Sequence, residues 1–205
     1  MKNLAKSLIA LVILSAASVS NATEGFYIGL NVGQATYDTV IDDFSDLQDG
    51  SITSASLDDS DTSFSLTLGY KINPNFAIEG GYIDLGELTV NAVSDGTGFL
   101  YAPGPVTVKI EADGLFFDAK GILPLNEKFS LYGKFGLLMW DEKGTLSDVT
   151  GSISADDDGT DIFFGVGASF NLTEKIALNG DFSRYQVDED SVDVDVLSIG
   201  IQFGF

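Results

Sequence analysis

The sequence predicts an all-β protein, an eight-stranded antiparallel up-and-down β-barrel whose strands cross a membrane. Apolar side chains alternate with small or polar ones along successive runs, which is the period of a strand with one apolar face. No stretch after residue 14 approaches the ~20 apolar residues that a spanning helix needs, so any spanning falls to strands of ~9–11 residues. Short polar turns also alternate with long tracts rich in Asp, Ser, Thr and Gly, a pattern typical of membrane barrels.

The first residues predict an export signal. Two lysines precede an apolar run over residues 8–14, and small residues follow at positions 20–22, where a signal peptidase reads the chain. We therefore expect a signal peptide over residues 1–22 and a single β-barrel domain over residues 23–205.

Turn signals set the number of strands. Residues 70–78, 121–131 and 170–178 each hold a short polar turn between alternating runs, about fifty residues apart,. Three such turns join six strands, and residues 26–37 and 192–205 supply two more. The expected barrel is closed and even-stranded, with both chain ends on the short-turn side, short periplasmic turns and long extracellular loops.

The two faces of the expected strands separate well. A soluble, lipocalin-like carrier would turn the apolar face inward around a ligand, but its outer face would then consist mostly of Gly, Ser, Ala and Asn, which suit a narrow lumen better. Arg184 shares the parity of apolar neighbours, so we expect it at the outer rim or displaced by a bulge. In the first strand Phe26, Ile28, Leu30 and Val32 oppose Tyr27, Gly29, Asn31 and Gly33.

Composition excludes several functions. The net charge of −21 repels phosphate backbones, so nucleic acid is a poor partner,. His and Cys are both absent, which removes Ser-His hydrolases, thiol enzymes and nearly all zinc sites. Two-carboxylate chemistry remains formally open, but acids are too abundant for a pair to indicate it, and we expect neither an enzyme nor a cofactor.

Five charged residues fall on the inward parity, well inside the strands. Buried charges are costly unless they are paired, and the interior of an eight-stranded barrel is just wide enough for side chains to fill. We therefore expect a hydrogen-bonded ionic core without an open channel, with a charge-gated pore as the alternative. The five residues are Glu79, Asp118, Lys120, Lys134 and Asp181.

Several segments carry a family resemblance. Residues 25–33 (GFYIGLNVG), 69–82 (GYKINPNFAIEGGY), 118–121 (DAKG), 131–136 (LYGKFG) and 197–205 (LSIGIQFGF) resemble the transmembrane domain of the outer-membrane protein A (OmpA) family over nearly all of residues 23–205. The resemblance implies a place in the outer membrane of a Gram-negative bacterium, among lipid and lipopolysaccharide. It also implies that the closing strand, through Phe203 and Phe205, is read by the outer-membrane assembly machinery.

The same resemblance matches Glu79, Lys120, Lys134 and Asp181 by position to lumenal charges linked to gating of a narrow pore, with Asp118 as an extra acid. The sequence printed here stops at Phe205, so the cell-wall tethering of the larger family members is not carried over.

Acidic tracts fill the expected external loops, as at residues 156–161 and 188–190. Such tracts are usually a solvated surface, and the spacing fails a calcium-binding EF-hand loop because Ser154 and Gly165 stand where acidic ligands are needed. We predict no dedicated metal site, while weak bridging by divalent ions stays a hypothesis. The expected role is structural or surface-interactive: envelope integrity, adhesion or contact with host or environmental ligands through the loops. The alternatives are a narrow gated ion pore and a soluble periplasmic carrier.

Overall fold

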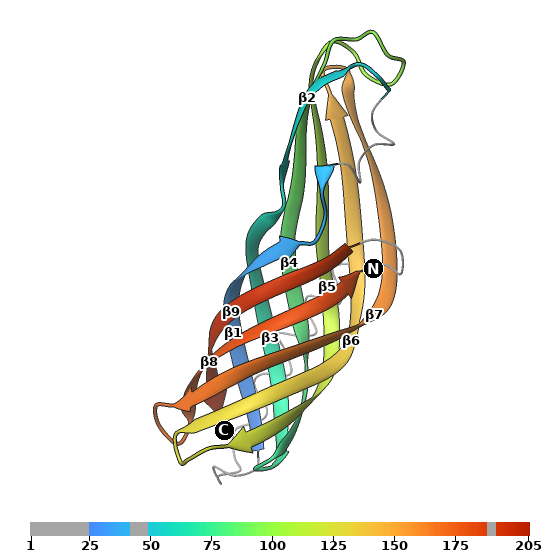
Figure 1. Ribbon diagram of the computed structural model, residues 1–205. Helices are drawn as coiled ribbons and strands as arrows, with labels where there is room; N and C mark the ends of the chain where they lie inside the picture. Colours follow the sequence, from blue (N-terminus) through green and yellow to red (C-terminus); the bar gives the residue numbers. More distant parts are fainter. Residues whose placement is uncertain (1–24, 42–48, 188–191) are drawn as a thin grey trace.

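The computed structural model describes residues 25–41, 49–187 and 192–205, so the expected signal peptide lies outside the described residues. The described chain is built from antiparallel strands, drawn in Figure 1. No helix among those residues has the length and apolar character needed to cross a bilayer. The strands are β1 (Gly25–Tyr37), β2 (Ile52–Asp58), β3 (Ser60–Asn73), β4 (Phe76–Ser94), β5 (Gly104–Pro124), β6 (Phe129–Asp148), β7 (Gly151–Asn171), β8 (Ile176–Val187) and β9 (Val192–Gly204).

Eight of these strands close into a ring. Sequential neighbours pair from β3 round to β9, β1 pairs with both β3 and β9, and the β4–β5 pairing completes the circle. A closed sheet leaves no unpaired edge, which the apolar interior of a bilayer requires. The eight-stranded up-and-down barrel expected from the sequence is therefore confirmed.

The ninth strand, β2, is the upper continuation of β3. Both pair with β4, β3 over residues 76–84 and β2 over residues 89–94. Between them Asp59 interrupts the ladder, and its carbonyl accepts the Tyr37 N–H at 2.8 Å. Sequence alternation alone could not show this break, because residues 52–58 are mostly small and polar.

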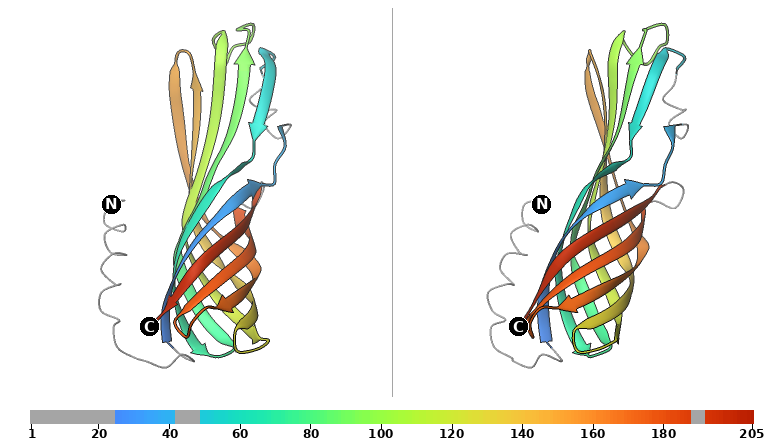
Figure 2. Two further views of the ribbon diagram at one scale, coloured as in Figure 1. Left: turned by 90° about the vertical axis from the view of Figure 1, so that its left-hand side faces the viewer. Right: turned by 60° about the vertical axis from the view of Figure 1, so that its left-hand side comes forward.

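Three short turns close one end of the barrel, where both described chain ends also lie (Figure 2). Each turn is held by a side-chain oxygen that accepts a backbone N–H two residues on. The distances are 2.8 Å from Asn75 N to Asn73 Oδ1, 2.9 Å from Lys128 N to Asn126 Oδ1, and 3.2 Å from Lys175 N to Thr173 Oγ1. The shared turn chemistry explains why the three segments look alike in sequence.

At the opposite end, the described residues form extended paired strands. Strands β4 to β7 run far beyond the barrel as a tall curved sheet, with β2 along one edge (Figure 1). Strands β6 and β7 stay paired through twenty residues up to the pair Asp148–Gly151, so only residues 149–150 form the turn. The acidic residues 156–161, which the sequence places in a loop, therefore belong to β7. The acidic residues 188–190 lie outside the described residues.

The wall of the barrel follows the expected alternation. Side chains such as Phe26, Phe64 and Phe135 point outward and are about half exposed, whereas Tyr27 and Tyr132 are buried in the lumen. On β5 the outward apolar stretch covers residues 115–123, in keeping with the ~9–11 residues that a tilted spanning strand needs,. The apolar face is therefore turned outward, which excludes the lipocalin-like arrangement.

Above this apolar belt the polarity of the two faces of the sheet is reversed. Four aspartates, Asp84, Asp113, Asp141 and Asp158, pair in register across β4 to β7 on the outer face, and we call them the aspartate row. Beyond the row the outer face is polar, while the inner face carries apolar side chains including Leu88, Val90 and Val106. The row thus marks where the sheet leaves lipid for water.

Strand β4 makes this exchange with a bulge. Its buried side chains fall at Ile83 and Leu85 below the bulge but at Leu88 above it, so the parity changes by one. The pairing with β5 shifts register between Asp84 and Glu87, and Gly86 there has φ +76°. Glycine adopts this left-handed conformation at little cost, which explains its place in the bulge.

Candidate functional site

The barrel interior is the candidate site, and its charges form two separate groups. In the first, Lys120 Nζ lies 2.9 Å from Glu79 Oε1, which also accepts the Tyr27 hydroxyl at 2.5 Å. The same Lys120 Nζ stands 4.0 Å from the centre of the Tyr132 ring, in a cation–π contact,. Strands β1, β4, β5 and β6 thus contribute one side chain each to a single buried cluster.

The second group joins β6, β8 and β9. Lys134 Nζ lies 2.9 Å from Asp181 Oδ2, and the Ser198 hydroxyl donates to Asp181 Oδ1 at 3.0 Å. Both side chains of the ion pair are almost fully buried. Charge-assisted bonds of this kind are the strong ones in a dry interior, so the two groups brace the barrel across its width.

Asp118 lies between these pairs without a partner of its own. It is 1% exposed, it pairs in register with Glu79, and neither of its carboxylate oxygens has a hydrogen-bond partner in the described part of the chain. The lumen therefore brings together four of the five predicted residues as ion pairs and leaves the fifth, Asp118, buried without a hydrogen bond to another described residue.

An apolar layer, which was not predicted from the sequence, lies above the charges. Phe163 stacks on Tyr185 with ring centroids 4.8 Å apart and meets Phe116 edge-on at 5.9 Å. Leu85, Leu138 and Val194 fill the same layer with 0% exposure. We call this layer the apolar seal; its buried members are residues 35, 37, 83, 85, 88, 90, 112, 116, 138, 140, 163, 185, 187, 194 and 196.

The parity of the upper strands carries the signal that could have found the seal. Leu138 and Phe163 fall on the inward parity of β6 and β7, and on β6 Lys134 shares that parity. The buried side chains of the apolar seal cross the lumen at this height and separate the ionic groups from the outer end of the barrel.

Below the charges the lumen opens as a pocket of about 370 Å³ at the short-turn end. Its inward-facing lining includes Lys71, Lys120, Ser130, Ser169 and Gln202. Lys71 was missed in the sequence analysis, although its place between the outward Tyr70 and Ile72 puts it on the inward parity. We call this space the mouth pocket.

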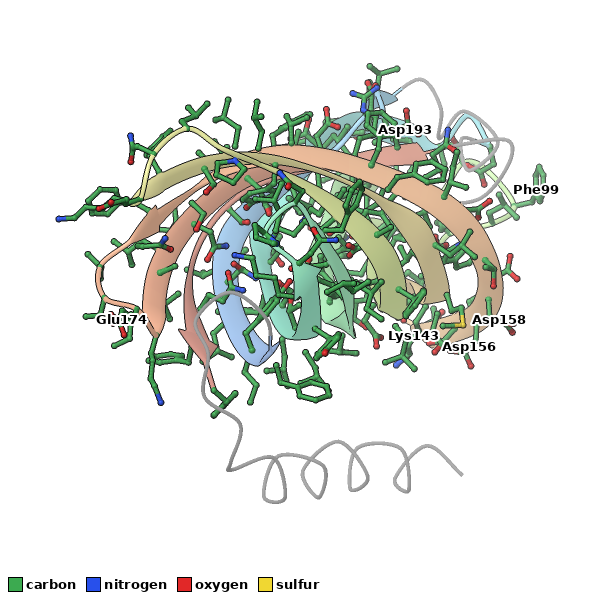
Figure 3. The ribbon with its side chains drawn as sticks, turned by 90° about the horizontal axis from the view of Figure 1, so that it is seen from below. Phe99, Lys143, Asp156, Asp158, Glu174 and Asp193 are labelled. Atoms are coloured by element: carbon green, nitrogen blue, oxygen red, sulfur yellow. The ribbon has the colours of Figure 1, made fainter. Side chains whose placement is uncertain are left out.

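Outside the barrel, charge gathers on the tall sheet, whose upper strands carry the basic residues Lys109 and Lys143. Lys109 Nζ lies 2.7 Å from Glu87 Oε1, and this hydrogen bond raises the pKa of Lys109. In Figure 3 Lys143, Asp156 and Asp158 all lie on the outer perimeter of the sheet. The external surface is therefore strongly acidic.

Arg184 is at the outer rim, which is one of the two positions expected for it. Its guanidinium reaches Asp195 Oδ2 at 2.6 Å and Asp193 Oδ2 at 3.2 Å, and the hydrogen bonds to Asp195 raise its pKa. The pairings of β8 show no register shift, so no bulge displaces it.

The loop after β4 is tied to the loop before β2 by Asp49. Its carboxylate accepts the Ser51 hydroxyl at 2.5 Å and the Leu100 N–H at 2.7 Å, and these hydrogen bonds lower its pKa to about 2. Phe99, next to Leu100, is 86% exposed and points away from the sheet in Figure 3.

The described residues contain no group of three or more acids arranged to hold a metal ion. Four acids in a row across strands are too evenly spread to converge on one ion, whose ligands stand ~2.0–2.6 Å from it. Phe203 and Phe205, the predicted assembly signal, lie at the short-turn end; Phe203 faces outward, and the Phe205 N–H donates to Phe26 O at 3.0 Å.

Comparisons with known proteins agree with this architecture. A family model described as "Outer membrane protein beta-barrel domain" matches residues 7–205. Ail, the attachment invasion locus protein of Yersinia pestis, superimposes with a TM-score of 0.53 at 18% identity, covering 88% of this chain and 99% of Ail.

Neisserial surface protein A (NspA) gives a TM-score of 0.53 at 18% identity, over 88% of this chain and 97% of NspA. A second Ail structure, in complex with the heparin analogue sucrose octasulfate, gives 0.52 at 16% identity, over 88% of this chain and 99% of that one. Comparison with curated protein sequences gives no match. At these identities the solved structures show the fold alone.

Proposed function

Since this chain belongs to the outer-membrane protein β-barrel domain family and is a Gram-negative outer-membrane protein, we propose that it makes contacts at the cell surface through the tall sheet formed by β2 and the upper parts of β4 to β7. A surface-interaction role is the general one for this fold. The observation that carries the specific proposal is that the external part, within the described residues, is built from paired strands and is acidic.

The chemistry of the outer face favours a cationic partner. The aspartate row, with Glu111 and Asp156 above it, outweighs Lys109 and Lys143 on that face. Complementary potentials speed encounter and exclude partners of like charge. Because this face is acidic, we propose that the chain selects positively charged ligands, unlike the polyanion sucrose octasulfate that is bound in one Ail structure,.

Neutral replacement of the aspartate row tests the proposal. Asp113, Asp141 and Asp158 lie in register on β5, β6 and β7, so Asn at all three positions removes three negative charges and keeps the turn, the register and the inward–outward alternation. Cells carrying the triple variant should lose most of their binding to polylysine-coated surfaces relative to cells carrying the unchanged protein. The protein should still migrate anomalously on gels until boiled, as closed barrels do. Unchanged binding to polylysine would refute the role of the tall sheet.

A narrow ion pore is the second candidate, and the apolar seal argues against it. An ion that passes the charged groups must still cross a layer in which Leu85, Leu138 and Val194 have no exposed surface, and transfer of a charge through such a layer is costly. We expect planar-bilayer recordings to show no unitary conductance for the full chain, and the same baseline for Glu79→Ala and Lys120→Ala. Charge-dependent opening in either variant would restore the pore as a function.

The roles assigned to the two ends of the sequence stay predictions. Residues 1–22 are proposed to direct export. Phe203 and Phe205 are proposed to be read by the assembly machinery, because both lie on the closing strand with Phe203 turned outward. Lipid and lipopolysaccharide are the proposed surroundings of the apolar belt.

A further inference from the structure

The short-turn end of the lumen has the features of a ligand site that the surface role does not use. The mouth pocket is about 370 Å³, inside the ~300–1,000 Å³ range of small-molecule sites. Its deep wall is the charged layer, and the apolar seal closes the lumen above that layer. A small solute can therefore enter from the turns but has no way through, which makes the space a blind pocket.

Several polar groups inside the mouth pocket can donate hydrogen bonds,. Ser130 and Ser169 pair in register on β6 and β7, and Gln202 reaches the same space from β9. Tyr27 and Tyr132 line its inner part, where Glu79 already accepts the Tyr27 hydroxyl. Hydroxyl and amide groups of this kind bind the oxygens of an anion.

Lys71 supplies a positive charge that the protein itself does not neutralise. The deeper lysines are each held by a carboxylate, Lys120 by Glu79 and Lys134 by Asp181. Lys71 faces the same lumen from β3, yet none of the ion pairs within the described part of the chain includes it. On the rim, the lining includes one acid, Glu174, and one further lysine, Lys175.

The contrast with the rest of the molecule strengthens this reading. The chain has 31 acidic and 10 basic residues, and the external sheet is acidic on its outer face. In the lining of the mouth pocket, by contrast, lysines and neutral hydrogen-bond donors outnumber acids. Charge selection here therefore runs opposite to charge selection at the external sheet.

We propose that the mouth pocket binds a small anion bearing a phosphate or carboxylate group, with Lys71 as its charged partner and Ser130, Ser169 and Gln202 as hydrogen-bond donors. The anion comes either from solution on the short-turn side or from the headgroup of a phospholipid at the rim. This site is independent of the surface role, since it lies at the other end of the barrel.

Inorganic phosphate and succinate are suitable probes. The full-length protein is placed in nanodiscs of zwitterionic phosphatidylcholine, and amide chemical shifts are followed during titration with each anion. We expect saturable shifts at Lys71, Ser130 and Gln202. Lys71→Gln should weaken binding at least tenfold, while Lys71→Arg should retain it.

Lys128→Gln is the matched control, because Lys128 is an exposed lysine of the β5–β6 turn at the same end and does not line the pocket. It should leave binding unchanged. Gln202→Glu, which adds an acid inside the pocket, should abolish binding and provides a second test if Lys71→Gln does not fold.

Nanodiscs containing phosphatidylglycerol distinguish the two sources. If the headgroup is the ligand, the same amides shift without added anion, and free phosphate no longer binds; if a solute is the ligand, phosphate titrates as before. Absence of saturable shifts with every probe, or equal weakening by Lys71→Gln and Lys128→Gln, would overturn the proposal.

Discussion

Breaking the Lys120–Glu79 pair should destabilise the barrel strongly. Lys120→Met removes the ammonium 2.9 Å from Glu79, whose side chain is only 6% exposed. The remaining carboxylate keeps the Tyr27 hydroxyl but loses its cation. Removal of one partner from such a buried pair costs about 3–5 kcal/mol, a large part of the ~5–15 kcal/mol that holds a typical domain folded.

The double variant Glu79→Gln, Lys120→Met separates pairing from packing. It leaves no uncompensated charge at the pair, so its cost should fall below the sum of the two single costs by about 3 kcal/mol. The residual loss reflects the cation–π contact of Lys120 with the Tyr132 ring,.

Urea unfolding in lipid vesicles measures these costs. The chain has a single tryptophan, Trp140, which belongs to the apolar seal and donates to Asp161 Oδ2 at 2.7 Å. Its emission therefore reports loss of the lumen. Additive single-variant costs, or costs near zero, would refute the pairing argument.

An exposed ion pair in the same chain provides the control. Lys109 and Glu87 form a shorter contact, 2.7 Å, but their side chains are 44% and 36% exposed. Solvent screens such pairs, so Lys109→Met should leave the unfolding midpoint within experimental error. The comparison tests whether burial, rather than the distance between the charges, decides the cost.

Three further predictions concern the loops, the lumen glycines and the aspartate row. The pKa of Asp49 is lowered from its ordinary value of 3.8 to about 2. Its tie to Leu100 is therefore complete above about pH 4 and is lost as the pH falls through 2. Amide exchange at Leu100 should accelerate over that window, and Asp49→Asn should remove the pH dependence. A methyl group at Gly69 would meet the Tyr27 ring, whereas at Gly121 the nearest contact is 3.9 Å away. In urea unfolding, Gly69→Ala should therefore cost about 1–3 kcal/mol, and Gly121→Ala should cost little. Equal costs for the two variants would contradict the lumen packing. Asp141 faces Asp113 and Asp158 in register. Asp141→Asn should therefore stabilise the barrel by about 0.2–1 kcal/mol at low salt, and by less in 1 M salt, where the Debye length is ~3 Å. A gain in stability that salt does not reduce would count against repulsion between these carboxylates.

Alternation along the strands was sufficient to predict the barrel wall. Phe26 faces out and Tyr27 faces in because the pleat fixes a period of two, and the three turn motifs fixed the strand number through Asn73, Asn126 and Thr173. The same parity located all five lumen charges, since a charge inside a lipid-facing strand has only the lumen to point into.

Other features depend on contacts between strands that one strand does not reveal. The pairing of Lys120 with Glu79 rather than with Asp118 follows from the stagger of β4 against β5, which no local pattern encodes. The tall sheet was missed because residues 151–161 are Asp-, Ser- and Gly-rich, a composition typical of loops; β6 supplies the partner that makes them a strand. Lys71 was overlooked although its parity was readable.

The bulge at Gly86 explains how β4 fits two environments, the apolar belt of the barrel and the polar external sheet. Without a change of parity, β4 would continue to place apolar side chains outward above the aspartate row, where the sheet meets water. The extra residue turns Leu88 and Val90 to the inner face. Tyr37 secures the bend by donating its hydroxyl to Gly86 O at 3.2 Å, and the carboxylate of Asp61 accepts the Glu87 N–H at 2.9 Å. The same residues thus end the outward apolar wall of β4, begin its part of the external sheet and hold the top of the apolar seal.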